Sequence, residues 1–264
     1  MRQGVLVLRA FYASPLGRVA RRMSARKVQE AWGGGGGLDV LALGYATPFL
    51  DMAGQAARRT VAAMPAAQGV EAWPAGGRNL ACLALEGALP MPNALFDRVL
   101  AVHALEESDS PLAVLREVHR VLAPSGRAIL AVTARHGLWA EAENTPFGHG
   151  RPFSRRQIEA LVREADLEPV GWTRALHAPP LPWAWRWADG FEAVGARLWP
   201  PFAGVILVEA VKQTFAVRPQ GLRARNPARP RFEPAPAGRE IAIKALPAGS
   251  AGTGPPRRAK SPEG

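Results

Sequence analysis

Residues 89–132 read LPMPNALFDRVLAVHALEESDSPLAVLREVHRVLAPSGRAILAV and contain the clearest structural pattern of the chain. The apolar run Val99–Val102 follows Phe96-Asp97 and has the length of a buried strand. Ser110-Pro111 predicts the start of a helix. The reason is that a serine hydroxyl can cap the first turn, and proline is tolerated where the backbone N–H has no partner.

The rest of this stretch predicts a helix followed by a second strand. Leu115, Val118 and Leu122 recur at helical spacing, whereas the charged residues between them fall on the opposite side. Residues 124–126, Pro-Ser-Gly, are expected to stop the helix. The apolar run 128–132 then predicts the next buried strand. Together these elements form one strand–helix–strand unit of a parallel sheet.

The same stretch resembles a known family. In the class I S-adenosylmethionine-dependent methyltransferase superfamily, the type 11 branch carries LPxPxxxFD before a strand and RVLxPGG at the end of the following helix. The matching residues here are 89–92, Phe96-Asp97 and 120–126. The resemblance covers about Leu38 to Val211 and implies an α/β fold, a doubly wound, mostly parallel, seven-stranded Rossmann-like methyltransferase sheet. It also implies S-adenosylmethionine as cofactor and a small-molecule substrate.

The distribution of charge and composition predicts three regions. Residues 1–37 form a basic N-terminal segment and Gly linker, and residues 38–216 form the methyltransferase-like domain. Residues 217–264 are rich in Pro, Ala and Gly, and they contain ten Lys or Arg against three Glu. This tail therefore supplies most of the net charge of +11, and it is expected to be disordered. A solvated tail and a weak, non-specific nucleic-acid contact are both open interpretations.

Composition limits the other classes of protein. A single cysteine, Cys82, excludes an internal disulfide framework and suits a reducing compartment. No apolar run approaches the length of about 20 residues that a transmembrane helix needs. Arginines interrupt the N-terminal segment, which does not read as a secretory signal, although it could imitate an organellar transit peptide. We expect a cytoplasmic protein, and the sequence does not give its oligomeric state.

Two glycine-containing stretches are candidates for a cofactor loop. Gly33–Gly37 precede the first predicted strand, Leu38–Leu43, so a linker is the better interpretation, because a phosphate loop follows a strand. The loop 44–48, Gly-Tyr-Ala-Thr-Pro, follows that strand, where the family carries VLDLGCGTG. Gly44 and Thr47 match this degenerate glycine motif, but alanine replaces the aspartate at position 42. Alanine and proline also replace two glycines.

The ends of the next strands provide weaker markers. The strand Thr60–Ala63 has no carboxylate at its end for the ribose hydroxyls, and Glu71 reaches the site only if its loop folds back. Glu86 follows the strand Leu80–Leu85 and either faces the adenine or is a solvated acid. The resemblance therefore implies a cofactor site formed by the following residues: Gly44, Tyr45, Ala46, Thr47, Met64, Glu86, Gly87 and Val102.

Two histidines are candidates for catalysis. His103 follows the strand that ends at Val102, where the family places residues near the transferable methyl group. A histidine can take a proton from an O–H or N–H nucleophile, although a structural hydrogen bond at a strand end is an alternative role. His149 belongs to residues 148–151, Gly-His-Gly-Arg, which either cover the substrate as a lid or form a structural turn.

The remaining features of the sequence are a tryptophan-rich stretch and the absence of metal-binding motifs. Trp183, Trp185, Trp187 and Trp199 suggest an apolar face that caps the site or meets a partner, and Arg186 makes a peripheral membrane contact conceivable. The scattered histidines and single cysteine predict no metal site. The sequence favours a methyltransferase. A catalytically inactive binding or scaffolding protein is the alternative, and RNA methylation assisted by the tail is a third hypothesis.

Overall fold

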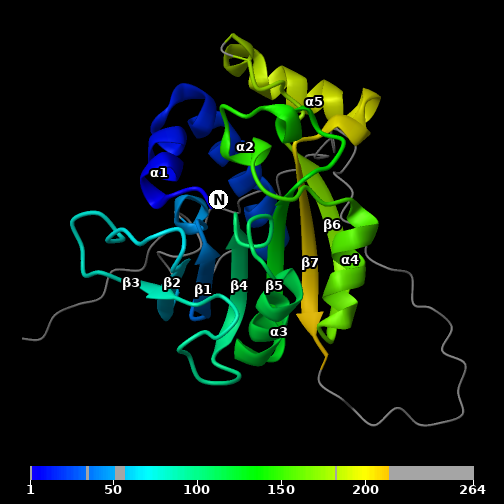
Figure 1. The fold of residues 1–264 in the computed structure, drawn as a ribbon. Helices are drawn as coiled ribbons and strands as arrows, with labels where there is room; N and C mark the ends of the chain where they lie inside the picture. The colour runs from blue at the N-terminus through cyan, green and yellow to red at the C-terminus, as the bar shows by residue number, and fades with distance from the viewer. Residues whose placement is uncertain (1, 34–35, 51–56, 182, 214–264) are drawn as a thin grey trace, which may run out of the picture. The chain divides into compact units, whose positions relative to one another are not determined.

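The computed structural model describes residues 2–33, 36–50, 57–181 and 183–213. These residues contain a seven-stranded sheet with the order β3-β2-β1-β4-β5-β7-β6 (Figure 1). The predicted tail from residue 217 lies outside the described residues. The strands are β1 (Asp39–Gly44), β2 (Arg59–Pro65), β3 (Ala81–Ala84), β4 (Phe96–Val102), β5 (Leu122–Thr133), β6 (Leu167–Ala175) and β7 (Val205–Lys212).

The topology confirms the predicted doubly wound sheet. β1 lies between β2 and β4 and is parallel to both, and β5 continues the parallel order beside β4. β7 alone runs antiparallel, to β5 on one side and to β6 on the other. The chain leaves β1 in one direction and returns on its other side at β4, which is the topological switch point where ligands bind in such sheets.

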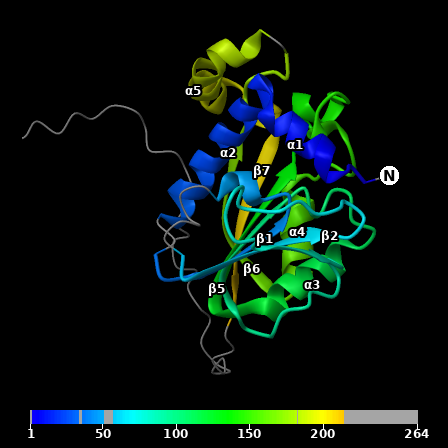
Figure 2. The same cartoon turned by 90° about the vertical axis from the view of Figure 1, so that its left-hand side faces the viewer.

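Helices cover both faces of the sheet (Figure 2). Val40 and Ala42 of β1 face the cluster built with the two N-terminal helices, whereas Leu41 and Leu43 face the cluster built with the next two helices. This alternation follows from the two-residue period of a strand. The helices are α1 (Val5–Ala13), α2 (Pro15–Trp32), α3 (Pro111–Val121), α4 (Arg155–Glu164) and α5 (Ala188–Leu198).

Local capping explains where the central helices begin. The Ser110 side chain accepts a hydrogen bond from the Ala113 amide, with Pro111 at the first helical position, as the sequence predicts. Ser154 and Gln157 form a capping box at α4, because each side chain accepts from the backbone of the other. One boundary differs from the expectation. β5 begins at Leu122, before the Pro-Ser-Gly stop signal, and these three residues lie in an irregular part of the strand, where its register with β4 shifts and Ser125 has a φ of 61°.

The N-terminal residues take part in the same core as the strands. Tyr12 of α1 and Met23 and Val28 of α2 are buried with residues of β1, β4 and β5. Gly33 follows α2 with a positive φ of 64°, a conformation that glycine adopts without strain. The segment predicted as a basic N-terminal segment and Gly linker is therefore largely a helical layer on the sheet. No helix among the described residues is long and apolar enough to cross a membrane.

Candidate functional site at the carboxyl edge of the sheet

The first loop passes very close to β4. Gly44 pairs with Val102 at the ends of β1 and β4, and the Tyr45 amide donates to the Val102 carbonyl at 2.8 Å. A Cβ on Gly44 would lie only 2.2 Å from that carbonyl oxygen, and the φ of Gly44 is +79°. The glycine is therefore required by the approach of two strands at the switch point. η1 (Thr47–Phe49) follows directly.

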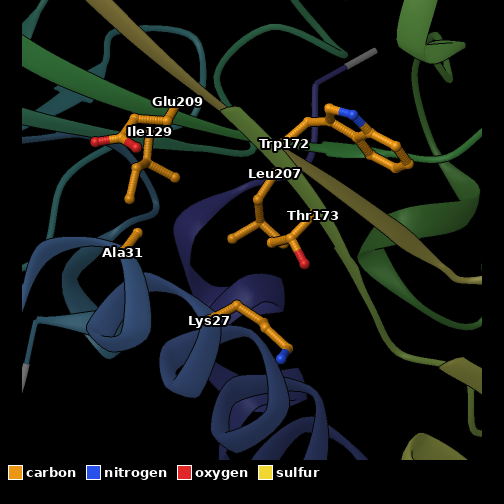
Figure 3. Close-up of a pocket in the computed structure, with 7 residues that line it drawn as sticks. All are labelled: Lys27, Ala31, Ile129, Trp172, Thr173, Leu207 and Glu209. Atoms are coloured by element: carbon orange, nitrogen blue, oxygen red, sulfur yellow. The ribbon is translucent and has the colours of Figure 1, made fainter. Parts of the chain in front are cut away.

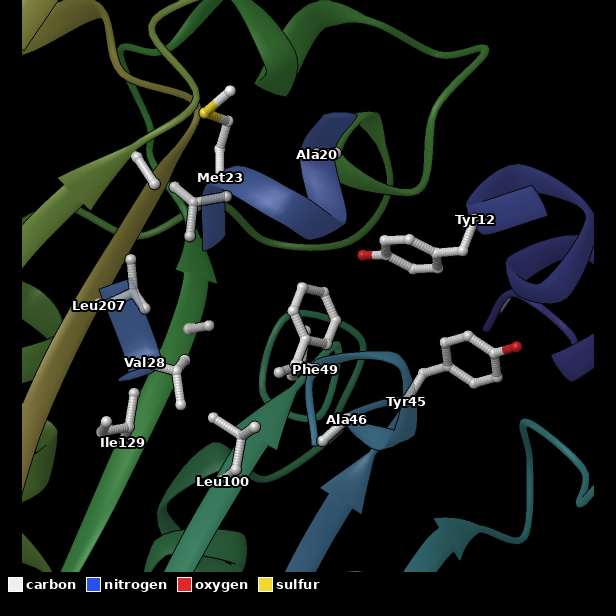
Figure 4. Packing of buried hydrophobic residues seen from close by; sticks show 14 of the residues in the cluster. Tyr12, Ala20, Met23, Val28, Tyr45, Ala46, Phe49, Leu100, Ile129 and Leu207 are labelled. Carbon is white, nitrogen blue, oxygen red and sulfur yellow. The ribbon is translucent and has the colours of Figure 1, made fainter. Parts of the chain in front are cut away.

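Aromatic rings cover this loop. The Tyr12 ring of α1 stacks on the Tyr45 ring with centroids 5.7 Å apart, and it meets the Phe49 ring edge-on (Figure 4). His103 lies 5.9 Å from the Tyr12 ring and 5.0 Å from the Phe147 ring, centroid to centroid. None of these five side chains is more than 6% exposed. We call these five residues the ring cluster: Tyr12, Tyr45, Phe49, His103 and Phe147. In the described conformation their side chains cover the loop and exclude solvent from it.

His103 lies where the sequence predicts, directly after β4. Its backbone has a φ of 51°, unusual for a residue with a side chain, and its Nε2 lies 2.7 Å from the Tyr12 hydroxyl. Burial lowers the pKa of His103 to about 4 because the charged imidazolium loses its hydration. The imidazole is therefore neutral near pH 7. It can accept a proton, although Tyr12 occupies one of its nitrogens.

The Tyr45 side chain contacts Glu71, the acid that reaches the site only if its loop folds back. The Tyr45 hydroxyl donates to a Glu71 carboxylate oxygen at 2.7 Å, and the Arg9 guanidinium lies 3.7 Å from the other oxygen. Burial and this carboxylate raise the pKa of Tyr45 above its usual range. The loop that carries Glu71 does fold back over the edge of the sheet, which was one of the open alternatives.

Glu86 is not a free loop acid, because the N-terminal segment binds it. Arg2 donates to both Glu86 carboxylate oxygens, at 2.7 and 2.6 Å, and to the Ala104 carbonyl at 3.0 Å. The Gln3 amide donates to Glu107 at 2.7 Å, and the Val5 amide donates to the Gln68 carbonyl. Residues 2–12 therefore lie across the carboxyl ends of β2, β3 and β4.

Glu106 is a feature that the sequence analysis did not single out. Its side chain is buried, and one carboxylate oxygen accepts from the Thr133 amide at 3.0 Å. The other oxygen has no hydrogen-bond partner. Desolvation raises the pKa of Glu106 to about 7, and nearby Glu107 adds to the rise. A carboxyl group of this kind at the edge of the sheet exchanges its proton near neutral pH.

The predicted lid lies against the loop that follows β4. The Arg151 amide donates to the Glu106 carbonyl at 2.7 Å, so residues 148–151 pack on this edge. His149 does not reach the ring cluster through any contact seen among the described residues; its Nε2 lies 2.8 Å from the Glu143 carbonyl. Phe147 of η3 (Pro146–Gly148) contacts His103 instead. No sequence signal distinguished this phenylalanine from other apolar residues.

The other predicted cofactor residues are mostly buried. Met64 and Ala46 are fully buried in the α1–α2 core, and Val102 and Thr47 are almost fully buried at the edge. A Cβ on Gly87 would lie 3.7 Å from Ala113 of α3. Their role in binding a cofactor stays a prediction. No group of metal-ligating side chains occurs in the described ranges.

One small pocket lies away from this edge. It is bounded by α2 and by β5, β6 and β7, with Lys27, Trp172 and Glu209 among its lining residues (Figure 3). Its volume of about 10 Å³ suits roughly one water molecule. None of the residues of the ring cluster lines it. The pocket is too small for a cofactor.

Comparison with known proteins identifies the family. A family model described as a methyltransferase domain matches residues 32–171. The chain belongs to this methyltransferase family. The resemblance of the sequence to the class I S-adenosylmethionine-dependent methyltransferase superfamily is confirmed. No curated protein matches the chain.

Solved structures share the fold of this methyltransferase. A methyltransferase from Archaeoglobus fulgidus is 12% identical, with a TM-score of 0.54, covering 77% of this chain and 96% of that chain. A putative methyltransferase from Haloferax volcanii, in complex with the Trm112 activator, is 19% identical, with a TM-score of 0.54 and coverages of 78% and 98%. The cyclase SpnF is 20% identical, with a TM-score of 0.51 and coverages of 74% and 82%. Likeness at this level shows the fold alone.

Proposed function

We propose that this methyltransferase binds S-adenosylmethionine at the carboxyl ends of β1, β3 and β4 and methylates a small-molecule acceptor. The observation that carries the proposal is the meeting of Gly44 and His103 at the switch point of the sheet, with Glu86 after β3 linked through Arg2 to the loop that follows β4. When bound, the cofactor supplies an electrophilic methyl group on a positively charged sulfur. The apolar ring of Phe147 beside His103 suits a compact organic acceptor better than a phosphate-rich polymer.

The residues fit the cofactor in part. The turn at Gly44 allows a ligand to approach the backbone, and Glu86 has the acceptor oxygens that an adenine amino group needs. Glu71 is the nearest substitute for the missing ribose acid, because the Tyr45 hydroxyl holds it beside the loop. In the described conformation, however, Arg2 occupies both oxygens of Glu86 and the ring cluster covers Gly44.

Because Arg2 and the ring cluster cover these residues, the cofactor needs a conformational change before it can bind. The cofactor site opens when residues 2–12 leave the carboxyl edge, which frees Glu86 and exposes the loop at Gly44. The measured affinity of a site that is open only part of the time is reduced by the open fraction. Once the segment moves, the neutral imidazole of His103 loses the Tyr12 hydroxyl and can accept a proton from the nucleophile. Proximity and alignment then bring about methyl transfer.

The series Arg2→Ala, Glu86→Ala and Arg26→Ala tests this proposal by calorimetry with S-adenosylhomocysteine. Arg2→Ala is expected to bind about tenfold more tightly than the wild type, because it breaks a largely buried ion pair of the closed form. Glu86→Ala breaks the same ion pair but removes the adenine acceptor, so it is expected to bind more weakly than the wild type. Arg26→Ala removes an exposed cation from α2 and should leave binding unchanged.

The proposal is tested by the opposite changes in affinity expected for Arg2→Ala and Glu86→Ala. If the ion pair only stabilised the fold, Arg2→Ala and Glu86→Ala would change the affinity in the same direction. If neither the wild type nor any of the three variants binds S-adenosylhomocysteine, the catalytically inactive binding protein becomes the better account.

The cytoplasmic location and the identity of the acceptor remain predictions. The third hypothesis, RNA methylation, depends on a tail outside the described residues.

A further inference from the structure

The segment between β6 and β7 carries an exposed apolar stripe. It contains η4 (Ala184–Trp187), α5 and η5 (Pro200–Phe202). Phe191, Val194 and Leu198 follow one another at helical spacing on one side of α5, and Trp187 directly precedes this helix. Phe191 is partly buried against the core. Trp187 and Leu198 are 70% and 71% exposed, and Trp183 is 57% exposed. We call Trp183, Trp187, Val194 and Leu198 the insertion stripe.

A neighbouring side of α5 is anchored to the rest of the protein, and this fixes the position of the insertion stripe. Ala188, Glu192 and Gly195 form the buried side of the helix. Glu192 accepts a hydrogen bond from the His177 amide at 2.9 Å, and Gly195 is packed so closely that a Cβ there would lie 2.4 Å from the His177 side chain. The stripe is therefore a fixed feature of the surface. Exposed apolar residues grouped in this way indicate an interaction site.

A basic helix face flanks the stripe. Arg18, Arg21, Arg22 and Arg26 lie on the exposed side of α2, and the only acid of this helix is Glu30, near its end. α2 packs against η4, and Arg22 forms an ion pair with Asp189 of α5 at 3.0 Å, so the two surfaces adjoin. Arg186 contributes another cation, with its guanidinium 5.4 Å from the Trp185 ring centroid.

An apolar stripe beside a basic helix face favours an anionic membrane as the partner. Tryptophans are enriched at the interface between lipid and water, and an apolar helix side flanked by arginines is typical of segments that lie on anionic membranes. A second copy of this chain would bring its own basic α2 face to the contact, so charge repulsion disfavours self-association. We propose that the insertion stripe and the basic face of α2 together form a docking surface for an anionic lipid bilayer.

The docking surface also has a defined place relative to the sheet. β6 runs parallel to β5, since both are antiparallel to β7, so the insertion leaves the sheet at its carboxyl edge. Trp139 of η2 (Leu138–Glu141) connects the two regions. Its indole donates to the Ala178 carbonyl at 2.8 Å and its ring contacts Phe147. The proposed surface thus adjoins the edge that holds the candidate site, without sharing its polar residues.

Vesicle flotation with the full chain tests the proposal. The wild type is expected to bind vesicles of phosphatidylcholine with phosphatidylglycerol, and to bind vesicles of phosphatidylcholine alone much more weakly. The double variant Trp187→Ser/Leu198→Ser should lose about tenfold or more in binding, because two large exposed side chains no longer enter the interface. The matched control Leu83→Ser/Leu85→Ser removes apolar residues that are 50% and 65% exposed at the β3 edge, and should bind as the wild type does.

The contribution of the basic face of α2 is tested with the double variant Arg18→Gln/Arg26→Gln. This variant should bind anionic vesicles more weakly, and its binding should depend less on salt. All variants retain the basic tail, so any binding through the tail is common to them. Three results would overturn the proposal: no binding of the wild type to anionic vesicles, equal binding of wild type and Trp187→Ser/Leu198→Ser, or ultracentrifugation showing a wild-type oligomer that this double variant abolishes. The last result would make the stripe a subunit interface.

Discussion

Replacing Gly44 with alanine is expected to remove about 4 kcal/mol of the free energy of unfolding. Two costs combine. A side chain at a φ of +79° is strained by about 1–3 kcal/mol, and a Cβ 2.2 Å from the Val102 carbonyl oxygen forces β1 and β4 apart, at a similar cost. Because proteins are stable by only about 5–15 kcal/mol, the variant should unfold at a much lower denaturant concentration. Equilibrium unfolding in urea measures the change.

Gly37→Ala separates the two costs. Gly37 has a φ of +72°, but no atom lies within 4 Å of the position of its Cβ, so only the backbone strain applies. We expect a loss of about 1 kcal/mol at that position. Equal losses for the two variants would show that β1 and β4 do not approach each other as described. A bulky residue at position 44 cannot be used to block the cofactor site, because its side chain would clash with the end of β4 and disrupt the fold.

The variant Glu106→Gln should be more stable than the wild type at pH 8, by on the order of 3 kcal/mol, and similar in stability at pH 4. Burial raises the pKa of Glu106 from 4.5 to about 7. A carboxyl group with a raised folded-state pKa stabilises the protein fully below the unfolded value. That stability is lost as pH rises through the folded value. The variant stays neutral, so it should not show this loss.

His103 opposes this effect in the wild type, so the difference between two proteins must be measured. The pKa of His103 falls from 6.5 to about 4, so the stability from its neutral form is present above pH 6.5 and is lost as pH falls toward 4. Urea unfolding of wild type and Glu106→Gln between pH 4 and 8 isolates Glu106. Asp109→Asn removes an exposed acid from the same loop and is the control. A constant difference across this pH range would contradict a buried, titrating Glu106.

The sequence predicts the central unit of the fold well, because local physics determines it. The helical spacing of Leu115 and Val118 and the Ser110 cap act within a few residues, and each is found in the structure. The order of the strands follows from the family resemblance together with the rules for parallel sheets. The extension of β5 back to Leu122 was missed because Pro124 and Gly126 are normally stop signals, whereas here they lie in an irregular part of the strand, where its register with β4 shifts.

The candidate site was less predictable because long-range contacts decide it. Nothing near Glu86 in the sequence indicates that Arg2 binds it, and nothing near His103 indicates the Tyr12 hydroxyl. The raised pKa of Glu106 depends on burial by several elements, which a single sequence does not reveal. The N-terminal residues were interpreted as a basic segment and linker outside the folded domain because their charge is conspicuous. The periodic apolar residues of α2, Val19, Met23 and Val28 among them, were the signal that could have placed them in the core.

Photo-crosslinking of methyl-labelled S-adenosylmethionine, followed by peptide mapping, tests the central claim most directly. The account predicts label on the peptide that contains Gly44–Phe49 or on the peptide that contains Glu86. The label should increase in Arg2→Ala and disappear when excess S-adenosylhomocysteine competes. Label confined to the basic tail, or no competed label on any peptide of the folded protein, would contradict a cofactor site at the carboxyl edge of the sheet.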